Sequence, residues 1–143
     1  MTLPDGFELL SRPSPLLDPW RPLYARTEPE RVTLGIEVRE PHTNSRGTVH
    51  GGLFAALADQ GMGHSCGARL ESEGLKILTL WTSSMAVDYF DAARPGQWLM
   101  FETVFIRTGR TLCHAEMDIT ADGRTVARAR GSFRISLKAK SAA

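Results

Sequence analysis

The chain has 143 residues, of which 42% are hydrophobic and 23% charged, and its formal net charge at pH 7 is +1. This length fits one domain, and this composition is typical of a folded core rather than of disorder. A charge so close to zero argues against binding to nucleic acid or to an anionic membrane, and no apolar run approaches the ~20 residues that span a bilayer.

The first 30 residues are interrupted by six prolines, at positions 4, 13, 15, 19, 22 and 29. Prolines at this spacing exclude a long helix, so we expect an extended arm with one or two short turns over residues 1–30. The arm is rich in leucine and aromatic residues, which predicts that it packs on the main domain, residues 31–143. The N-terminus lacks the charged start and long apolar core of a signal peptide, and the expected location is the cytoplasm.

The main domain begins with a strand and a helix. Residues 32–38 alternate apolar side chains with polar or small ones, as a half-buried strand does. Residues 44–50 are mostly polar or glycine and predict a loop, which leads into an alanine- and leucine-rich helix. A second long strand is expected at residues 75–90 and another at 98–107.

Two turns separate the remaining strands. Thr108-Gly109-Arg110 predicts one hairpin, and Ala121-Asp122-Gly123-Arg124 predicts another. The strand between them places Cys113, Ala115, Met117 and Ile119 on one face. The inward face of the last strand carries Ala127, Ala129, Phe133, Ile135 and Leu137. One strand, one helix and four further strands indicate an α+β fold, with a single antiparallel sheet around one long helix.

Residues 44–59 carry the clearest chemical signal. Gly51 and Gly52 stand where the helix starts, and glycines there leave backbone N–H groups open to close approach. These N–H groups lie at the positive end of the helix dipole, which suits an oxygen that gains negative charge. Asp59 follows about two turns later in a run of apolar and small residues. An oxyanion donor and a carboxylate are two of the parts that acyl transfer requires.

The helical projection, at roughly 100° per residue, places Asp59 on a face of small side chains. The members of this face are Ala55, Ala56, Gly63 and Cys66. A second face carries Leu53, Leu57, Gln60 and His64. Small side chains around Asp59 permit close approach of a ligand or of another backbone. The alternative is that Asp59 is a solvated helix residue, as lone helical acids usually are.

Gly51 and Asp59 cannot act on one bond from the same helix. They are eight residues apart, which is about 12 Å along the axis at ~1.5 Å per residue. If both act on the same carbonyl, they come from two copies of the chain with antiparallel helices. The chemistry therefore predicts a two-fold dimer with shared sites.

The pattern Asn44-x-x-Gly47-x-x-His50-Gly51-Gly52, followed by Leu57-Ala58-Asp59, resembles the signature of hotdog-fold acyl-CoA thioesterases of the phenylacetate-pathway type. The resemblance extends more weakly over residues 31–137. It implies a hotdog fold, in which an antiparallel sheet wraps one long central helix. It also implies hydrolysis of acyl-CoA to a free acid and coenzyme A, by a homodimer or a homotetramer made of paired dimers.

The resemblance also implies roles for individual residues. The N–H of Gly51 would polarise the thioester carbonyl, and Asp59 of the partner subunit would be the general base or the nucleophile. Asn44 would lie near the thioester or its water, and His50 would hold the loop and shape the site. Thr82 would orient the water, with Ser83 and Ser84 as alternatives because the alignment across the preceding loop is uncertain by a residue.

Further residues are expected to contact the substrate. Gly52, Ser83 and Phe54 are candidates for substrate binding, and Trp81 and Met85 for the wall of the acyl pocket. In hotdog enzymes, segments like the N-terminal arm can cover one wall of this pocket. The arginines that could bind the phosphates of coenzyme A include Arg46, Arg69, Arg107, Arg110 and Arg130. The acyl group itself cannot be read from the sequence, and aromatic, medium-chain and hydroxylated groups all remain open.

Other chemistries find no support in the sequence. There is no Gly-x-Ser-x-Gly elbow, and the four histidines and two cysteines have no metal-site or disulfide spacing. No cofactor is expected, since coenzyme A is part of the substrate. The rivals are a non-catalytic acyl-CoA sensor and a hotdog dehydratase. The retained Asp59 argues against the sensor, and the setting of His50 argues against the dehydratase.

Overall fold

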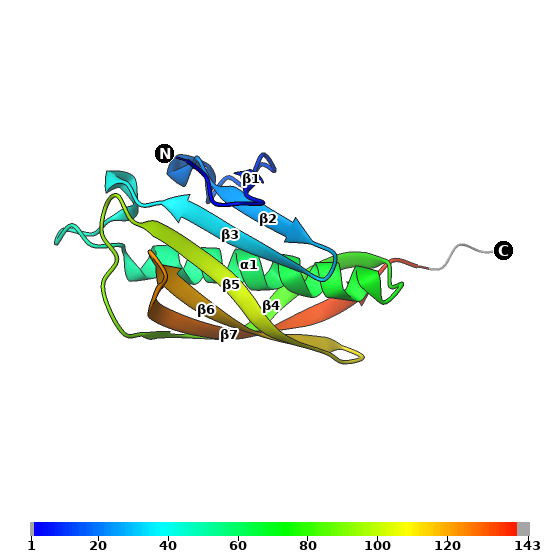
Figure 1. The fold of residues 1–143 in the computed structure, drawn as a ribbon. Helices are drawn as coiled ribbons and strands as arrows, with labels where there is room; N and C mark the ends of the chain where they lie inside the picture. The colour runs from blue at the N-terminus through cyan, green and yellow to red at the C-terminus, as the bar shows by residue number, and fades with distance from the viewer. Residues whose placement is uncertain (1, 140–143) are drawn as a thin grey trace.

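The structure is a computed structural model that describes residues 2–139, with one long helix, α1 (Gly51–Ser72), packed along a seven-stranded antiparallel sheet (Figure 1). The strands are β1 (Glu8–Leu9), β2 (Tyr24–Glu28), β3 (Arg31–Glu37), β4 (Ile77–Tyr89), β5 (Trp98–Thr108), β6 (Leu112–Ala121) and β7 (Arg124–Leu137). Their order across the sheet is β1-β2-β3-β5-β6-β7-β4. Two short 3-10 helices, η1 (Asp18–Trp20) and η2 (Glu40–His42), complete the fold. The predicted α+β architecture around one helix is confirmed.

The strand order follows from local turns. Asp122 and Gly123 both have positive φ, at 47° and 83°, as the two central residues of a type I′ turn must. This turn joins β6 to β7 as a hairpin, in the place that the sequence predicts. The longer connection between β4 and β5 lets β4 return to the far side of β7, so β4 becomes an edge of the sheet.

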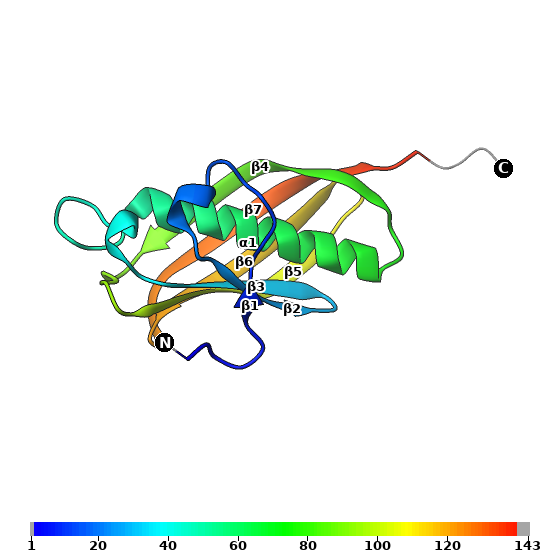
Figure 2. The same cartoon turned by 90° about the horizontal axis from the view of Figure 1, so that it is seen from above.

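The N-terminal segment adds strands to the sheet. It forms β1, η1 and β2, and β2 pairs antiparallel with β3, so the sheet has seven strands where the sequence predicts five. Prolines on both sides of β2 make this part of the sequence look irregular, although none of the five residues of β2 is a proline. The loop before η1 runs across α1 toward β4 (Figure 2).

The core fills the space between α1 and the sheet. The helix face that carries Asp59 is buried at one end and open at the other. Cys66, which the projection places beside Asp59, is fully buried with Cys113, and both thiols are free. Asp59 is half-buried. Because strands twist relative to the helix, the sheet covers the helix at Cys66 but leaves it open at Asp59. Cys66 therefore lies on the projected face but is covered by the sheet, and it does not share the open surface around Asp59.

One placement on the last strand needs correction. Leu137, assigned to the inward face, is 47% exposed because β7 ends there, whereas Ile135 is half-buried and packs against the core as predicted. Within residues 2–139, no helix is long and apolar enough to cross a membrane.

Gly35 in β3 lies under the ring of Trp98, and a Cβ at this position would overlap that ring. Trp98 in turn contacts Phe7 edge-on at 5.1 Å between ring centroids. We expect Gly35→Ala to lower the free energy of unfolding by about 1–3 kcal/mol, the usual range for overpacking. Urea denaturation measures this effect. Gly67→Ala is the control, since its Cβ would meet only Leu80 at 3.7 Å and alanine favours a helix; equal losses in both variants would contradict the explanation.

His42 fastens η2 to the N-terminal segment. Its Nδ1 accepts from the Arg39 N–H at 2.9 Å, and its Nε2 lies 2.9 Å from the Trp20 carbonyl oxygen, to which it must donate. Burial lowers the pKa of His42 and outweighs the opposing effect of the hydrogen bond to Trp20. The folded chain therefore holds this imidazole neutral where an unfolded histidine would already take up a proton.

This difference predicts that stability falls as pH drops. Below about pH 6.5 the unfolded chain binds more protons than the folded chain at His42, so the free energy of unfolding decreases. We expect a lower urea midpoint at pH 5.5 than at pH 7.5, and a smaller difference in a His42→Gln variant. Ordinary carboxylates titrate below about pH 4.3 and contribute little in this window. Equal midpoints at the two pH values would contradict the prediction.

Candidate active site

The start of α1 is organised by His50. His50 is the N-cap residue, and its Nδ1 accepts from the Gly52 N–H at 2.8 Å. Gly51 is the first helical residue, and its carbonyl accepts from the Tyr89 hydroxyl at 2.6 Å. Among residues 2–139, the Gly51 N–H donates no hydrogen bond. The cap thus occupies the Gly52 N–H and leaves the Gly51 N–H available to a ligand.

Asn44 closes the loop that precedes the helix. Its Oδ1 accepts from the backbone N–H groups of Arg46, at 2.9 Å, and Thr48, at 3.3 Å, while its Nδ2 donates to the Thr48 hydroxyl at 3.1 Å. The amide is therefore engaged within its own loop. In this single chain the Asn44 side chain therefore closes its own loop, and its expected place near the thioester stays a prediction.

Asp59 and Thr82 lie side by side. The Thr82 hydroxyl donates to Asp59 Oδ1 at 2.5 Å and so fixes the carboxylate against β4. Ser83 falls at an irregularity in the pairing of β4 with β7, between Thr82 and Ser84. Of the three candidates on β4, Thr82 is the one that the structure brings to Asp59.

The Asp59 carboxylate opens into a cavity of about 670 Å³ between α1, β4 and the N-terminal segment. Gly63 and Gly67 on α1 have no side chains and so leave space along one wall of the cavity. Apolar side chains line another wall, and these are Val32, Ile77, Leu78, Leu80 and Phe133. A cavity of this size lies within the range of small-molecule sites and is large enough to hold an acyl group.

The cavity ends in a polar region. Gln60 Nε2 lies 2.7 Å from His64 Nε2, and since an amide NH₂ can only donate, His64 Nε2 accepts. Burial, and then the positive charge of Arg12, lowers the pKa of His64, so the ring is neutral at pH 7. Arg12, Pro13 and Ser14 of the N-terminal segment face the same cavity.

The remaining substrate candidates are separated. Phe54 is 3% exposed and packs edge-on against Tyr89 at 5.6 Å, so within one chain it belongs to the core and not to the cavity wall. Trp81 is 59% exposed on β4, and Met85 is half-buried. Gly52 is exposed, but its N–H is taken by His50.

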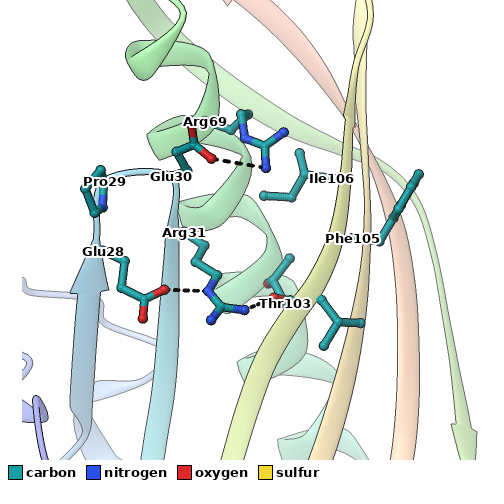
Figure 3. Close-up of a pocket in the computed structure, with 9 residues that line it drawn as sticks. Glu28, Pro29, Glu30, Arg31, Arg69, Thr103, Phe105 and Ile106 are labelled. Atoms are coloured by element: carbon teal, nitrogen blue, oxygen red, sulfur yellow. Dashed lines mark hydrogen bonds and ion pairs between the residues drawn. The ribbon is translucent and has the colours of Figure 1, made fainter.

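A second cavity of about 600 Å³ lies between the β2–β3 turn, α1 and β5, and shares no lining residue with the first (Figure 3). Figure 3 shows Arg31 and Arg69 reaching into it, each already ion-paired: Arg31 Nε with Glu28 at 2.5 Å, and Arg69 Nη2 with Glu30 at 3.6 Å. Arg130 likewise pairs with Asp88. Arg46, Arg107 and Arg110 have no ion pair within the described part of the chain.

No group of three or more histidine, cysteine or acidic side chains in residues 2–139 could hold a metal ion. The groups that the described residues do bring to this region are a helix N-terminus, a carboxylate and a hydroxyl, and groups of these kinds suit addition of water to a carbonyl.

The family model of the thioesterase superfamily matches residues 46–128, a span that contains the start of α1, Asp59 and Thr82. The chain belongs to the thioesterase superfamily. A Pseudomonas aeruginosa protein that is named as an esterase is 33% identical over 136 residues, which cover 94% of this chain and 98% of that protein. Acyl-coenzyme A thioesterase 13 of Mus musculus is 31% identical over 106 residues, 71% of each chain.

Solved structures of thioesterase superfamily proteins share the architecture. A mutant of the phenylacetic acid degradation protein PaaI of Thermus thermophilus matches with a TM-score of 0.73 and 23% identity, over 87% of this chain and 100% of that one. A Streptococcus pneumoniae hypothetical thioesterase solved with coenzyme A matches with a TM-score of 0.68 and 24% identity, over 82% and 91%. The helix and seven-stranded sheet are thus a hotdog fold, and the predicted family resemblance is confirmed.

Sequence reasoning missed part of this candidate site. Tyr89, which holds the start of α1 to β4, carries no local signal. Gln60 and His64 stand at i and i+4 on one helix, a spacing at which side chains meet, and this could have marked them as a pair. That Arg12 comes near them depends on the path of the N-terminal segment, which no local pattern reveals.

Proposed function

We propose that the protein hydrolyses acyl-CoA thioesters to a free acid and coenzyme A. The observation that carries the proposal is the Asp59 carboxylate, which Thr82 fixes at a cavity large enough for an acyl group, on a helix whose Gly51 N–H donates to no other residue of the range 2–139. Support for acyl-CoA as the substrate comes from the mouse acyl-coenzyme A thioesterase and from the Streptococcus pneumoniae relative solved with coenzyme A.

In the proposed reaction, the carbonyl oxygen of the thioester accepts from the Gly51 N–H, which stabilises the negative charge of the tetrahedral intermediate. Asp59 takes a proton from water as the water oxygen bonds to the carbonyl carbon. The carbon–sulfur bond then breaks, and the proton passes to the leaving thiolate. Direct attack by Asp59, through a mixed anhydride that water hydrolyses, is the alternative route. Thr82 orients the carboxylate in both.

The proposed site needs two subunits, since Gly51 and Asp59 of one helix are about 12 Å apart along its axis. The free edge of β4 supports a dimer, because an unpaired strand edge is a template for pairing. This strand and the residue after it expose large apolar side chains, among them Leu78 and Trp81 near the Asp59 cavity and Tyr89 and Phe90 near the start of α1. Pairing of two β4 edges would cover these side chains.

Release of free thiol from a panel of acyl-CoAs tests the proposal. The panel contains phenylacetyl-, hydroxybenzoyl-, short-chain and medium-chain thioesters, and calorimetry measures binding of each in parallel. We expect turnover of at least one thioester. Tight binding of acyl-CoA without any turnover would support the non-catalytic sensor instead.

A further inference from the structure

One wall of the Asp59 cavity is a loop that is stabilised by hydrogen bonds between its own residues. The Arg21 guanidinium donates to the carbonyls of Leu10 and Arg12, and its Nε donates to Asp18 Oδ1 at 2.8 Å. Asp18 Oδ1 also accepts from the Ser14 N–H at 3.1 Å. These bonds fold residues 10–21 into a fixed loop beside α1, as Figure 2 shows. The cavity therefore has a preformed boundary at the end where Arg12 and Ser14 lie.

The Gln60–His64 pair gives this end of the cavity an unfilled pattern of donors and acceptors. Gln60 Nε2 donates to His64 Nε2, so a neutral His64 carries its proton on Nδ1. Within residues 2–139, neither Gln60 Oε1 nor His64 Nδ1 has a hydrogen-bond partner, and neither atom is fully buried, as expected for two residues of the cavity wall. One acceptor and one donor thus lie in the same part of the cavity.

A hydroxyl matches this pattern better than the alternatives. It both donates and accepts, so it can satisfy Gln60 Oε1 and His64 Nδ1 together. A carboxylate cannot donate, and an alkyl end would leave both groups unpaired. Arg12 and Glu71 line the cavity with opposite charges, which favours a neutral group over an ion.

The distance to the reaction centre sets the length of the acyl group. His64 is five residues beyond Asp59 on α1, or about 7.5 Å along the axis at ~1.5 Å per residue. An extended acyl chain of six carbons can bridge this distance. The wall between the two ends is apolar at Leu80 and Phe133, which suits the carbon skeleton.

We propose that Gln60 and His64, backed by the Arg21-folded loop, select acyl groups that carry a hydroxyl at the end remote from the thioester. This inference rests on the proposed function, because it assigns the acyl group of that same site. It makes Gln60 and His64 specificity-determining residues and Arg21 a positioning residue.

The test compares kcat/KM for 6-hydroxyhexanoyl-CoA and hexanoyl-CoA, two thioesters of equal chain length. We expect wild type to prefer the hydroxylated substrate by about tenfold or more, since a site built to hydrogen-bond a hydroxyl rejects the analogue without it. In Gln60→Leu the preference disappears, and hexanoyl-CoA gains from the new apolar contact. Gln97→Leu, which changes the only other glutamine in a loop outside the cavity, keeps the wild-type preference.

The outcomes separate the two proposals. Equal kcat/KM for both thioesters in wild type would overturn this inference and leave the thioesterase proposal standing. If no thioester is hydrolysed, the same pair is compared by calorimetry. Tighter binding of 6-hydroxyhexanoyl-CoA, lost in Gln60→Leu, would then support the inference, and equal Kd values would overturn it.

Arg21→Met tests the positioning role, because methionine keeps much of the side-chain length without the donors. Loosening the loop should raise KM for 6-hydroxyhexanoyl-CoA while kcat changes less, since the loop does not touch the reacting atoms. A fall in kcat alone, or an unchanged KM in a variant that remains folded by circular dichroism, would contradict this role.

Discussion

Asp59→Asn is expected to lower kcat for acyl-CoA hydrolysis by about 10²–10⁴-fold, the usual contribution of a positioned general base. The fold should survive, because an asparagine Oδ1 can still accept the hydrogen bond that Thr82 donates to Asp59. What the amide cannot do is take a proton from water or attack a carbonyl. Thiol release measured under saturating substrate checks the loss, and urea denaturation checks the fold.

Asp118→Asn is the matched control. Asp118 lies on β6 and pairs with Arg128 at 2.9 Å, away from the Asp59 cavity. The same chemical change there should leave kcat at the wild-type value, since a largely exposed ion pair contributes little to stability. Wild-type kcat in Asp59→Asn, or an equal loss in both variants, would exclude Asp59 as the base or nucleophile.

The parts of the site that local pattern determines could be predicted from the sequence. Gly51 does begin the helix, and Thr82 does reach Asp59, because a helix start and a strand alternation are set within a few residues. The hairpin at Asp122-Gly123 is local for the same reason. The catalytic roles of these residues stay predictions that the experiments above test.

The parts that depend on distant packing could not be predicted. Whether Cys66 or Gly63 shares the open face with Asp59 depends on how a twisted sheet wraps the helix, and a planar projection ignores that twist. The loop before η1 is held beside the cavity by Arg21, which donates hydrogen bonds to the carbonyls of Arg12 and Leu10, nine and eleven residues upstream. Such contacts connect segments whose own sequences show only prolines and turns.

Gly51→Pro should remove the proposed oxyanion donor without harming the helix, and so lower kcat by about 10²–10³-fold. Gly51 is the first helical residue, where proline is favoured because its missing N–H would have no partner inside the helix. Proline also requires extended backbone in the residue before it, and His50 already has φ −64° and ψ 134°. Thermal denaturation should show a melting temperature near that of wild type.

Mixing Gly51→Pro with Asp59→Asn tests the shared site directly. In a mixed dimer, one of the two sites combines an intact Gly51 N–H with an intact Asp59, and the other site has lost both. Random exchange of equal amounts should therefore restore about a quarter of wild-type kcat, although each variant alone is nearly inactive. Subunits carrying different tags allow the mixed dimer to be purified and assayed by itself. If the purified mixed dimer is as inactive as its parents, Gly51 and Asp59 do not serve one site from two subunits. Recovery of activity would instead establish that each carbonyl is held by one chain and attacked with the help of the other.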